Sequence, residues 1–373
     1  MRRPFSFLAL ILGLIFSFTL SASAQDPSGW VARYPLSPQH PAVAIGWTNL
    51  QAALAPDIKL ELRLSGPRLG TPEALEALAR GQHQAGIIPL ASYPKAFPYW
   101  AMLGEMFMIG RDPLAAAAAI TELVMLECTA CQENLARQKL VFLGTYGAGR
   151  YGLIAPRPLT SVTSFKDRAI ATPGSLWDRL TSHLGASAAG GLANPRRALA
   201  LGEVTTLIDV PSALLDSHLA GHAIAFTRLP LGGYRGASPL TINRNAWAEL
   251  DADQHKRLFQ AAAASLVQIT TAYQASEQAA LAQAKQNGAT ASDGNPLLQD
   301  RIRSFAIEDL AWVTATAEAR FGIDDAPAFS QRLKELFDKY ATLLAPPAHQ
   351  AAAIALLQGE IFDRLDPDTY GLE

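Results

Sequence analysis

The sequence lacks the motifs that mark most catalytic and nucleic-acid-binding proteins. It contains no Gly-x-Ser-x-Gly motif, no phosphate-binding Walker loop and no strand-linked Gly-x-Gly-x-x-Gly. Its basic residues do not cluster, and 31 lysines and arginines stand against 33 acidic residues. A mildly acidic chain without a basic patch gives no reason to expect a nucleic acid as partner. These absences favour a binding protein over an enzyme, and we expect no cofactor.

Cysteine is scarce, and its two occurrences, Cys128 and Cys131, form one Cys-Thr-Ala-Cys segment. In an oxidising compartment, a pair with this spacing at the end of a helix can form a disulfide. Redox chemistry is the alternative for Cys-x-x-Cys. The pair follows an Ala-rich helical stretch, however, without the strand that precedes a thioredoxin-like site. We therefore expect a structural disulfide or two free thiols.

Long apolar runs are also rare, and the one that stands out is at the N-terminus. Arg2 and Arg3 precede the uncharged residues 5–20, and Ala22-Ser23-Ala24 supplies the small residues of a cleavage site. This pattern predicts a signal peptide cleaved after Ala24 and a periplasmic protein. An uncleaved membrane anchor is the alternative. Cleavage would remove two arginines and no acids, so the balance becomes 29 against 33, a net charge of −4.

The histidines do not indicate a metal site. His218 and His222 have the i, i+4 spacing of metal ligands, but the glutamate of a His-Glu-x-x-His motif is missing and Gly221 predicts a helix end. We expect both imidazoles to be partly exposed and no metal to be bound.

Strand and helix patterns alternate in the first two thirds of the chain, which is typical of an α/β fold. Strands are expected over residues 30–34, 58–64, 85–89, 141–144, 169–173, 205–210 and 223–227. Helices are expected over residues 42–54, 72–81, 113–138, 177–184, 246–286, 297–319, 328–344 and 350–364. The Gly/Ala-rich residues 185–195 are expected to form a loop. This order predicts two α/β lobes clasped by long helices.

Several stretches together resemble the extracytoplasmic solute receptors of TRAP transporters, with similarity over about residues 30–290. They are the loop 36–41, the strand-loop-helix segment 65–81, residues 93–112, Gly149-Arg150 with 157–159 and 165–170, and Asn243-x-x-x-Trp247-x-x-Leu250. The resemblance implies a two-lobed periplasmic binding protein of type II-like, Venus-flytrap architecture with its ligand in the cleft. It also implies integral membrane permease subunits as partners.

On that resemblance, lobe I is expected over residues 27–149 and about 238–280, and lobe II over 150–237 and about 281–330. Residues 331–373 would form a helical C-terminal extension, either a packing brace, a dimerisation helix or a partner contact. Many family members grip the ligand carboxylate with an arginine on the lobe II sheet, and Ala171 occupies that position here. A second family arginine is matched by Arg150, which predicts that Arg150 holds a carboxylate.

Other residues are candidates for the cleft by position. Gly70 and Thr71 open a helix whose free N–H groups suit an anion, although Thr71 fits equally well as a plain N-cap. The remaining candidates are residues that end strands or carry aromatic rings: Pro89, Tyr93, Trp177 and Asp209. Both aromatic residues have core packing as their alternative.

The sequence therefore predicts a receptor that captures a small organic anion, bearing a carboxylate, for a TRAP-type transporter. A sensory receptor for a membrane kinase would share the fold and the ligand binding. The absent arginine at Ala171 leaves a non-carboxylate solute as a further alternative. A secreted enzyme would need a nucleophile, base or metal set that the sequence does not supply.

Overall fold

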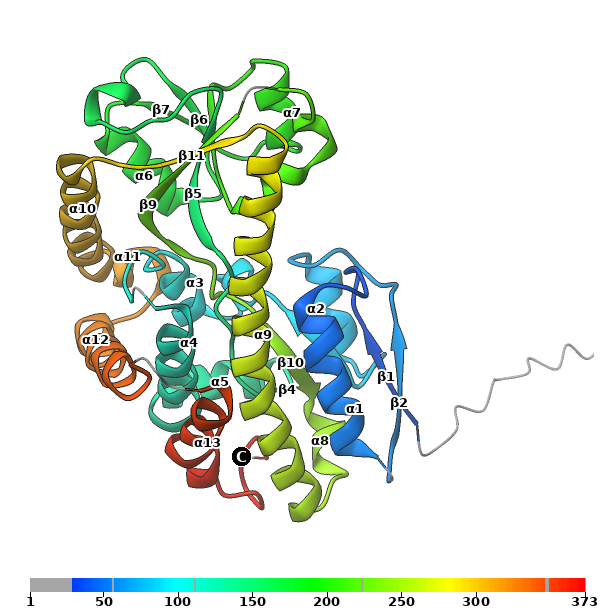
Figure 1. The fold of residues 1–373 in the computed structure, drawn as a ribbon. Coiled ribbons are helices and arrows are strands. Elements are labelled where there is room, and N and C mark those ends of the chain that lie inside the picture. The colour runs from blue at the N-terminus through cyan, green and yellow to red at the C-terminus, as the bar shows by residue number, and fades with distance from the viewer. Residues whose placement is uncertain (1–28, 56, 111, 223, 346–348, 373) are drawn as a thin grey trace, which may run out of the picture.

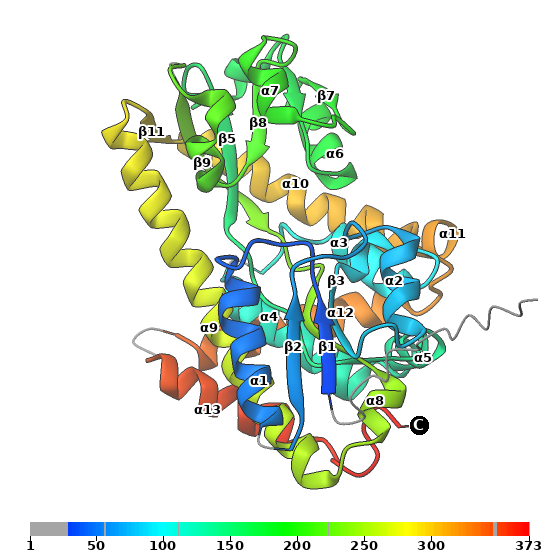
Figure 2. The ribbon, with the colours of Figure 1, turned by 90° about the vertical axis from the view of Figure 1, so that its right-hand side faces the viewer.

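The chain forms two lobes, each built around one β-sheet (Figure 1). A computed structural model describes residues 29–372 apart from residues 56, 111, 223 and 346–348. The expected signal peptide lies outside the described residues. The expected two-lobed α/β architecture is confirmed, with helices packed around both sheets (Figures 1 and 2).

The lobe I sheet has the strand order β2-β1-β3-β10-β4. Its strands are β1 (Gly29–Arg33), β2 (Lys59–Arg63), β3 (Ala85–Ile88), β4 (Leu140–Phe142) and β10 (Ser238–Asn243). Strands β1, β2 and β3 run parallel, whereas β10 is antiparallel to both β3 and β4. Every residue of β3 and β10 is buried, as expected for central strands covered on both faces.

The lobe II sheet has the order β11-β9-β5-β8-β6-β7. Its strands are β5 (Arg150–Ala155), β6 (Ala169–Ala171), β7 (Ser187–Ala189), β8 (Thr206–Asp209), β9 (Ala225–Gly233) and β11 (Thr290–Asp293). Strand β5 is antiparallel to β8 and β9, and its register with β9 shifts between Arg150 and Gly152. The sequence patterns missed β10 and β11, and β7 lies where a loop was expected.

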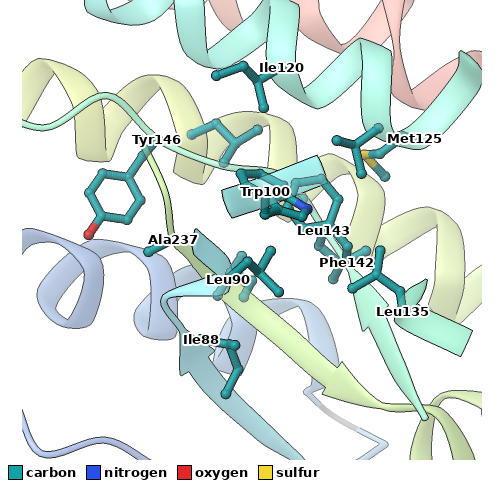
Figure 3. Close-up of a cluster of buried hydrophobic side chains, with 14 of the residues drawn as sticks. Ile88, Leu90, Trp100, Ile120, Met125, Leu135, Phe142, Leu143, Tyr146 and Ala237 are labelled. Atoms are coloured by element: carbon teal, nitrogen blue, oxygen red, sulfur yellow. The ribbon is translucent and has the colours of Figure 1, made fainter. Parts of the chain in front are cut away.

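Helices surround both sheets. Lobe I carries α1 (Thr48–Leu54), α2 (Pro72–Ala79), α3 (Pro98–Gly104), α4 (Pro113–Glu122), α5 (Thr129–Arg137) and α8 (Arg244–Ala248). Lobe II carries α6 (Ser175–His183), α7 (Pro195–Ala200) and the start of α10 (Pro296–Ala315). Figure 3 shows part of the lobe I core, where Trp100, Phe142 and Leu143 pack between β3, β4 and α4.

The single helix expected over residues 113–138 is wrong, because the chain breaks at Cys128. Helix α4 continues through a π-helical segment, Leu123–Glu127, and Cys128 leaves helical geometry at φ −96° and ψ 84°. Among the described residues no single helix has the length and hydropathy to cross a bilayer; α4 and α5 pass that test only as a pair bent by 81°. The apolar side chains of α4 are buried inside lobe I.

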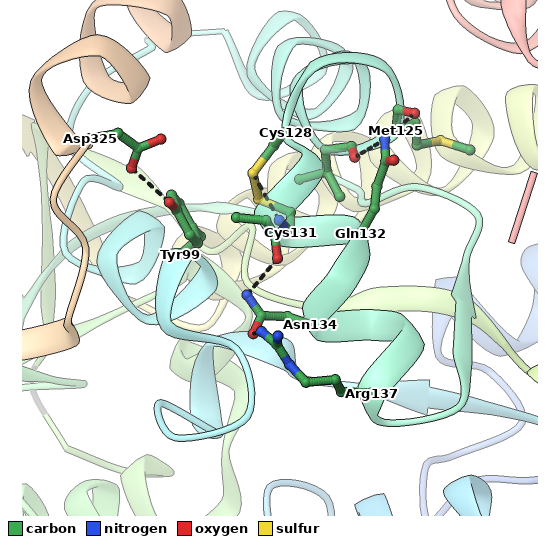
Figure 4. The surroundings of a disulfide bond; sticks show 10 residues. Tyr99, Met125, Cys128, Cys131, Gln132, Asn134, Arg137 and Asp325 are labelled. Atoms are coloured by element: carbon green, nitrogen blue, oxygen red, sulfur yellow. Dashed lines mark hydrogen bonds between the residues drawn. A yellow bond between two sulfur atoms is a disulfide. The ribbon is translucent and has the colours of Figure 1, made fainter. Parts of the chain in front are cut away.

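The cysteines form a disulfide across this break (Figure 4). Cys128 caps the N-terminus of α5, since its sulfur accepts from the N–H of Cys131. The pair thus opens a helix instead of ending one. Both side chains are buried, with 8% of Cys128 and 1% of Cys131 exposed, so an external thiolate has little access. Figure 4 also shows Tyr99 donating to Asp325, a contact that joins α3 to the start of a later helix.

Removing the disulfide is expected to have a small effect on stability. A cross-link that closes a loop of only a few residues takes little entropy from the unfolded chain, so we expect a loss of about 2 kcal/mol or less. Urea unfolding of the Cys128→Ser, Cys131→Ser double variant measures it. A loss of several kcal/mol would mean that the bond supports far more than its own loop.

The longest helix, α9 (Ala252–Gln286), runs through both lobes (Figure 1). It begins with a capping box in which Asp251 and Gln254 satisfy each other's backbone N–H groups. This cap separates α9 from α8, so the continuous helix expected over residues 246–286 is wrong at its start. Leu258 to Ile269 supply buried side chains to the lobe I core, whereas Ala284 packs in lobe II.

One segment of lobe I completes the core of lobe II. Phe107 and Met108, which follow α3, pack with Trp177 of α6, Leu231 of β9 and Ile302 of α10. The buried guanidinium of Arg235 holds this segment, because it donates to the carbonyl oxygens of Phe107, Ile109 (2.8 Å) and Gly110 (3.0 Å). Burial lowers the pKa of Arg235 to about 10. The two lobes therefore share this piece of chain.

The C-terminal region returns to lobe I and packs against it. Helices α11 (Ala317–Phe321), α12 (Ala326–Leu343) and α13 (Gln350–Glu360) follow α10, and the chain enters the lobe I core from Val313 onward. The expected boundary placed residues up to 330 with lobe II. At the end of the chain, the Tyr370 hydroxyl donates to the carbonyl oxygen of Phe142 at 2.6 Å. The described part of the extension thus packs on lobe I, and its role beyond that packing stays a prediction.

Candidate functional site

Besides α10, which leads from lobe II back to lobe I, three chain segments connect the lobes, and the candidate residues lie around these three. They are residues 143–149 between β4 and β5, residues 234–237 between β9 and β10, and the middle of α9. Glycine is required where these segments touch. A Cβ atom on Gly147 would lie 2.4 Å from the carbonyl oxygen of Pro113, and one on Gly149 would lie 2.6 Å from Cγ of Glu277. The Gly-rich stretch before Arg150 thus lets the crossing segment pass close to α4 and α9.

Five of the nine tyrosines gather at these connections. They are Tyr93 from lobe I, Tyr146 and Tyr234 from the crossing segments, Tyr151 from β5 and Tyr273 from α9. We call them the tyrosine cluster. Tyr146 and Tyr273 stack with ring centroids 5.4 Å apart, and Figure 3 shows the Tyr146 hydroxyl pointing away from the aliphatic core. Except for Tyr93, sequence reasoning missed these residues; the signal was two tyrosines flanking the Gly-rich turn.

The tyrosine hydroxyls lie close to one another and stay protonated. Burial raises the pKa of Tyr93 to about 12, and burial together with neighbouring phenols and carboxylates raises the pKa values of Tyr151, Tyr234 and Tyr273. Each hydroxyl is therefore a hydrogen-bond donor at neutral pH. The Tyr273 hydroxyl also lies 2.7 Å from Nε2 of His40, whose pKa is lowered by burial.

The structure brings the lobe I candidates close to one another. The Tyr93 hydroxyl donates to the carbonyl oxygen of Thr71 at 3.0 Å, and Gly70 has a φ of 82° and adjoins Pro89. Thr71 takes the N-cap position of α2, but its side chain accepts no bond from a helix N–H. The N-cap expectation is correct in position and wrong in the side-chain bond.

The lobe II candidates are engaged within the protein. Trp177 is 4% exposed, and its ring packs edge-on against Tyr151 at 4.8 Å and near Phe107. Asp209 accepts from Nε of Arg196 at 3.1 Å, and the same guanidinium reaches Asp216 at 3.2 Å. Ala171 is 3% exposed and lies among apolar side chains of lobe II. Trp177 is therefore a packing residue of the lobe II core. The carboxylate of Asp209 is neutralised by the Arg196 guanidinium.

Arg150 lies apart from these candidates, in a pocket of about 550 Å³. Elements from both lobes and α9 line it: Asp112 and Pro113 at the start of α4, Gln274, Glu277, Gln278 and Leu281 of α9, and lobe II residues that include Arg150, Tyr151, Phe226, Arg228, Asp293 and Gln299. Gly70, Thr71, Pro89, Tyr93, Trp177 and Asp209 are not among its lining residues. The predicted residues therefore divide between two places at the lobe junction.

The charges of this pocket leave one guanidinium without an anion. Asp112 accepts from the N–H groups of Leu114 and Ala115 and caps α4. Asp293 is bound by both Nε and Nη2 of Arg228, at 2.7 and 2.8 Å. Glu277 accepts from the N–H and hydroxyl of Ser212, and burial raises its pKa. Among the described residues, exposed Arg150 has no ion-pair partner.

The histidine pair does not form a metal site. His218 lies 2.7 Å from Asp216, and both His218 and His222 are exposed. Within residues 29–372, gaps aside, no group of three or more His, Cys, Asp or Glu side chains is arranged to hold a metal ion.

Comparison with known proteins gives matches by structure alone. No protein-family model and no curated protein matches the sequence. A TRAP periplasmic solute-binding protein from Desulfovibrio salexigens has a TM-score of 0.69 at 18% identity, covering 86% of this chain and 98% of its own. A Bordetella pertussis extracytoplasmic solute receptor that binds pyroglutamic acid has a TM-score of 0.63 at 16% identity, covering 83% and 99%.

A third such protein, from Bordetella bronchiseptica, was solved with bound (R)- and (S)-mandelate. Its TM-score is 0.62 at 18% identity, covering 84% of this chain and 99% of its own. The shared architecture extends over nearly the whole of each solved protein. The chain therefore has the fold of TRAP periplasmic solute-binding proteins.

Proposed function

We propose that this protein is an exported periplasmic receptor that binds a small carboxylate and delivers it to the permease subunits of a TRAP-type transporter. The fold supports this proposal, because solved proteins that share it bind pyroglutamic acid and mandelate, both carboxylic acids. The N-terminal pattern ending at Ala24 supports export. The solved proteins that share the fold are named as solute-binding proteins and receptors, which supports a binding protein over an enzyme.

The observation that carries the ligand class is the unpartnered guanidinium of Arg150. It is exposed in a pocket whose three carboxylates already have partners within the protein. A planar guanidinium binds a carboxylate through two parallel hydrogen bonds and stays charged at any working pH. A carboxylate in this pocket would give Arg150 the anionic partner that the described residues do not supply.

The pocket also has the construction that lobe closure requires. Its lining comes from α4 in lobe I, from β5 and β9 in lobe II, and from α9, which runs through both lobes. A ligand that touches both lobes stabilises the arrangement in which they approach each other. Capture would therefore change the surface that the receptor presents to a membrane partner.

Binding is tested by thermal unfolding of the mature protein with organic acids, amino acids, sugars and polyols. A ligand at 1000 times its Kd adds about 4 kcal/mol to the free energy of unfolding. Arg150→Ala is expected to weaken carboxylate binding at least about 30-fold, since loss of a desolvated charge pair costs about 2 kcal/mol or more. The matched control is Arg157→Ala, an exposed lobe II arginine outside the pocket.

Carboxylate hits that Arg157→Ala retains and Arg150→Ala loses would establish the proposed site. Hits confined to neutral compounds would replace the carboxylate with another solute class, in agreement with the alanine at position 171. Carboxylate hits untouched by Arg150→Ala would move the site to the tyrosine cluster.

A further inference from the structure

Glu277 lines the same pocket as Arg150 and carries the opposite charge when ionised. Its residue is 8% exposed, and Ser212 orients the carboxylate through a backbone N–H at 2.8 Å and a hydroxyl at 3.1 Å. A carboxylate offers about four acceptor positions, so two bonds from Ser212 leave others for a ligand. Glu277 is thus a fixed acceptor set into the wall of the pocket.

Arg150 and Glu277 do not neutralise each other. No ion pair joins them in the described structure, although Gly149, the residue before Arg150, adjoins the Glu277 side chain. The other acids of the pocket are already committed, Asp293 to Arg228 and Asp112 to the start of α4. Two opposite charges therefore face one pocket of about 550 Å³ without an ion pair between them.

The environment of Glu277 favours a cation in the ligand. Burial raises its pKa, and so does the nearby Asp209 carboxylate, while the bonds from Ser212 and the charge of Arg196 act the other way. A buried carboxylate is costly unless a positive group or hydrogen-bond donors compensate it. An ammonium group placed in the pocket would supply that compensation.

We infer that the pocket selects a zwitterion: a small ligand whose carboxylate binds Arg150 and whose ammonium or iminium N–H groups bind Glu277. This inference rests on the proposed function and names its substrate class as amino-acid-like instead of simply anionic. Three glutamine side chains, Gln274, Gln278 and Gln299, line the same pocket and offer amide donors and acceptors around the two charges. Glu277 then determines specificity, and Arg150 determines affinity for the carboxylate that all candidates share.

The test uses pairs of acids that differ in one group. L-alanine is paired with L-lactate, L-proline with tetrahydrofuran-2-carboxylate, and phenylglycine with mandelate; each pair has one shape and one carboxylate, and only the first member carries the amino nitrogen. Isothermal titration of the mature protein is expected to show, for at least one pair, affinity at least tenfold higher for the amino acid. Glu277→Gln keeps an acceptor for Ser212 and is expected to reduce that ratio to about one.

Two further variants separate the two proposals. Glu203→Gln removes an exposed lobe II acid outside the pocket and should keep the wild-type ratio. Arg150→Ala should weaken both members of a pair. Hydroxy or ether acids that bind through Arg150 as tightly as their amino partners would overturn the zwitterion inference and leave the carboxylate receptor standing. An amino-acid preference that survives Glu277→Gln would also overturn it. Binding by no member of any pair would overturn the zwitterion inference, whereas the carboxylate receptor is overturned only when the wider thermal screen finds no carboxylate.

Discussion

Trp247→Ala is expected to lower the free energy of unfolding by about 3–5 kcal/mol, the range for removing a large aromatic side chain from a packed core. Trp247 of α8 is fully buried in the lobe I core. Its ring stacks on His255 at 4.0 Å and packs against Phe259 and Tyr370. Its Nε1–H donates to the carbonyl oxygen of Tyr370 at 2.8 Å, so the substitution also leaves that carbonyl without its donor.

Chemical unfolding of the variant beside Trp312→Ala measures this effect against a matched control. Trp312 of α10 is 44% exposed, and its ring lies between the guanidiniums of Arg179 and Arg320 at 4.8 Å from each. Exposed cation–π contacts contribute about 0.5–1 kcal/mol each, so the control should lose far less stability. Equal losses for the two variants would contradict the view that Trp247 joins the C-terminal residues to the lobe I core.

Gly232→Ala is the second large effect, with an expected loss of about 2–5 kcal/mol. Gly232 lies near the end of β9 with a φ of 75°, a conformation that costs an L-residue about 1–2 kcal/mol. A Cβ atom would lie 1.9 Å from the carbonyl oxygen of Phe107 and 3.0 Å from Cα of Met108. Backbone must move to relieve this clash, and overpacking of that kind costs about 1–3 kcal/mol more.

Gly202→Ala is the control, because Gly202 has the same φ of 75° with no atom within 4 Å of the added methyl. The difference in unfolding free energy between the two variants isolates the clash from the backbone conformation. Gly232→Ala should also weaken ligand binding, since it displaces the segment that leads from α3 to the pocket residues Asp112 and Pro113. Equal destabilisation by the two substitutions would show that the backbone at Phe107 and Met108 can move away from the added methyl group without a loss of stability.

Patterns within single segments predicted the fold well. Alternation over residues 58–64 gave β2, and the short apolar run at 85–89 gave β3, since both strands are defined by their own side chains. Strand β11, with the sequence Thr-Ala-Ser-Asp, has no such pattern and exists because it pairs with β9. The break at Cys128 was hidden because residues on both sides of it favour helix, and tertiary packing sets the bend.

Sequence patterns named individual residues of the candidate site, but they did not show which of these residues lie together in the structure. Arg150 was identified because it matches an arginine of the TRAP solute receptors that the sequence resembles, and the structure places it in a pocket. Successive residues of a strand take opposite sheet faces, so Arg150 can line the pocket while Trp177 and Asp209 lie outside its lining. The pairing of Asp209 with Arg196 joins residues from β8 and α7, which no spacing rule connects. Glu277 sits within a 35-residue helix whose pattern gives no hint of a partner in lobe II.

The shared segment after α3 limits how far each lobe can exist by itself. A fragment holding the lobe II sheet alone would lack Phe107 and Met108 and would expose the apolar surface that they cover. A lobe I fragment would carry the same two side chains into water, together with the upper turns of α9. Neither half is thus an autonomous folding unit, although the outline in Figure 1 suggests two. Because a lobe I segment completes the lobe II core, unfolding of one lobe exposes apolar surface of the other. Thermal unfolding is therefore expected to follow one transition instead of two.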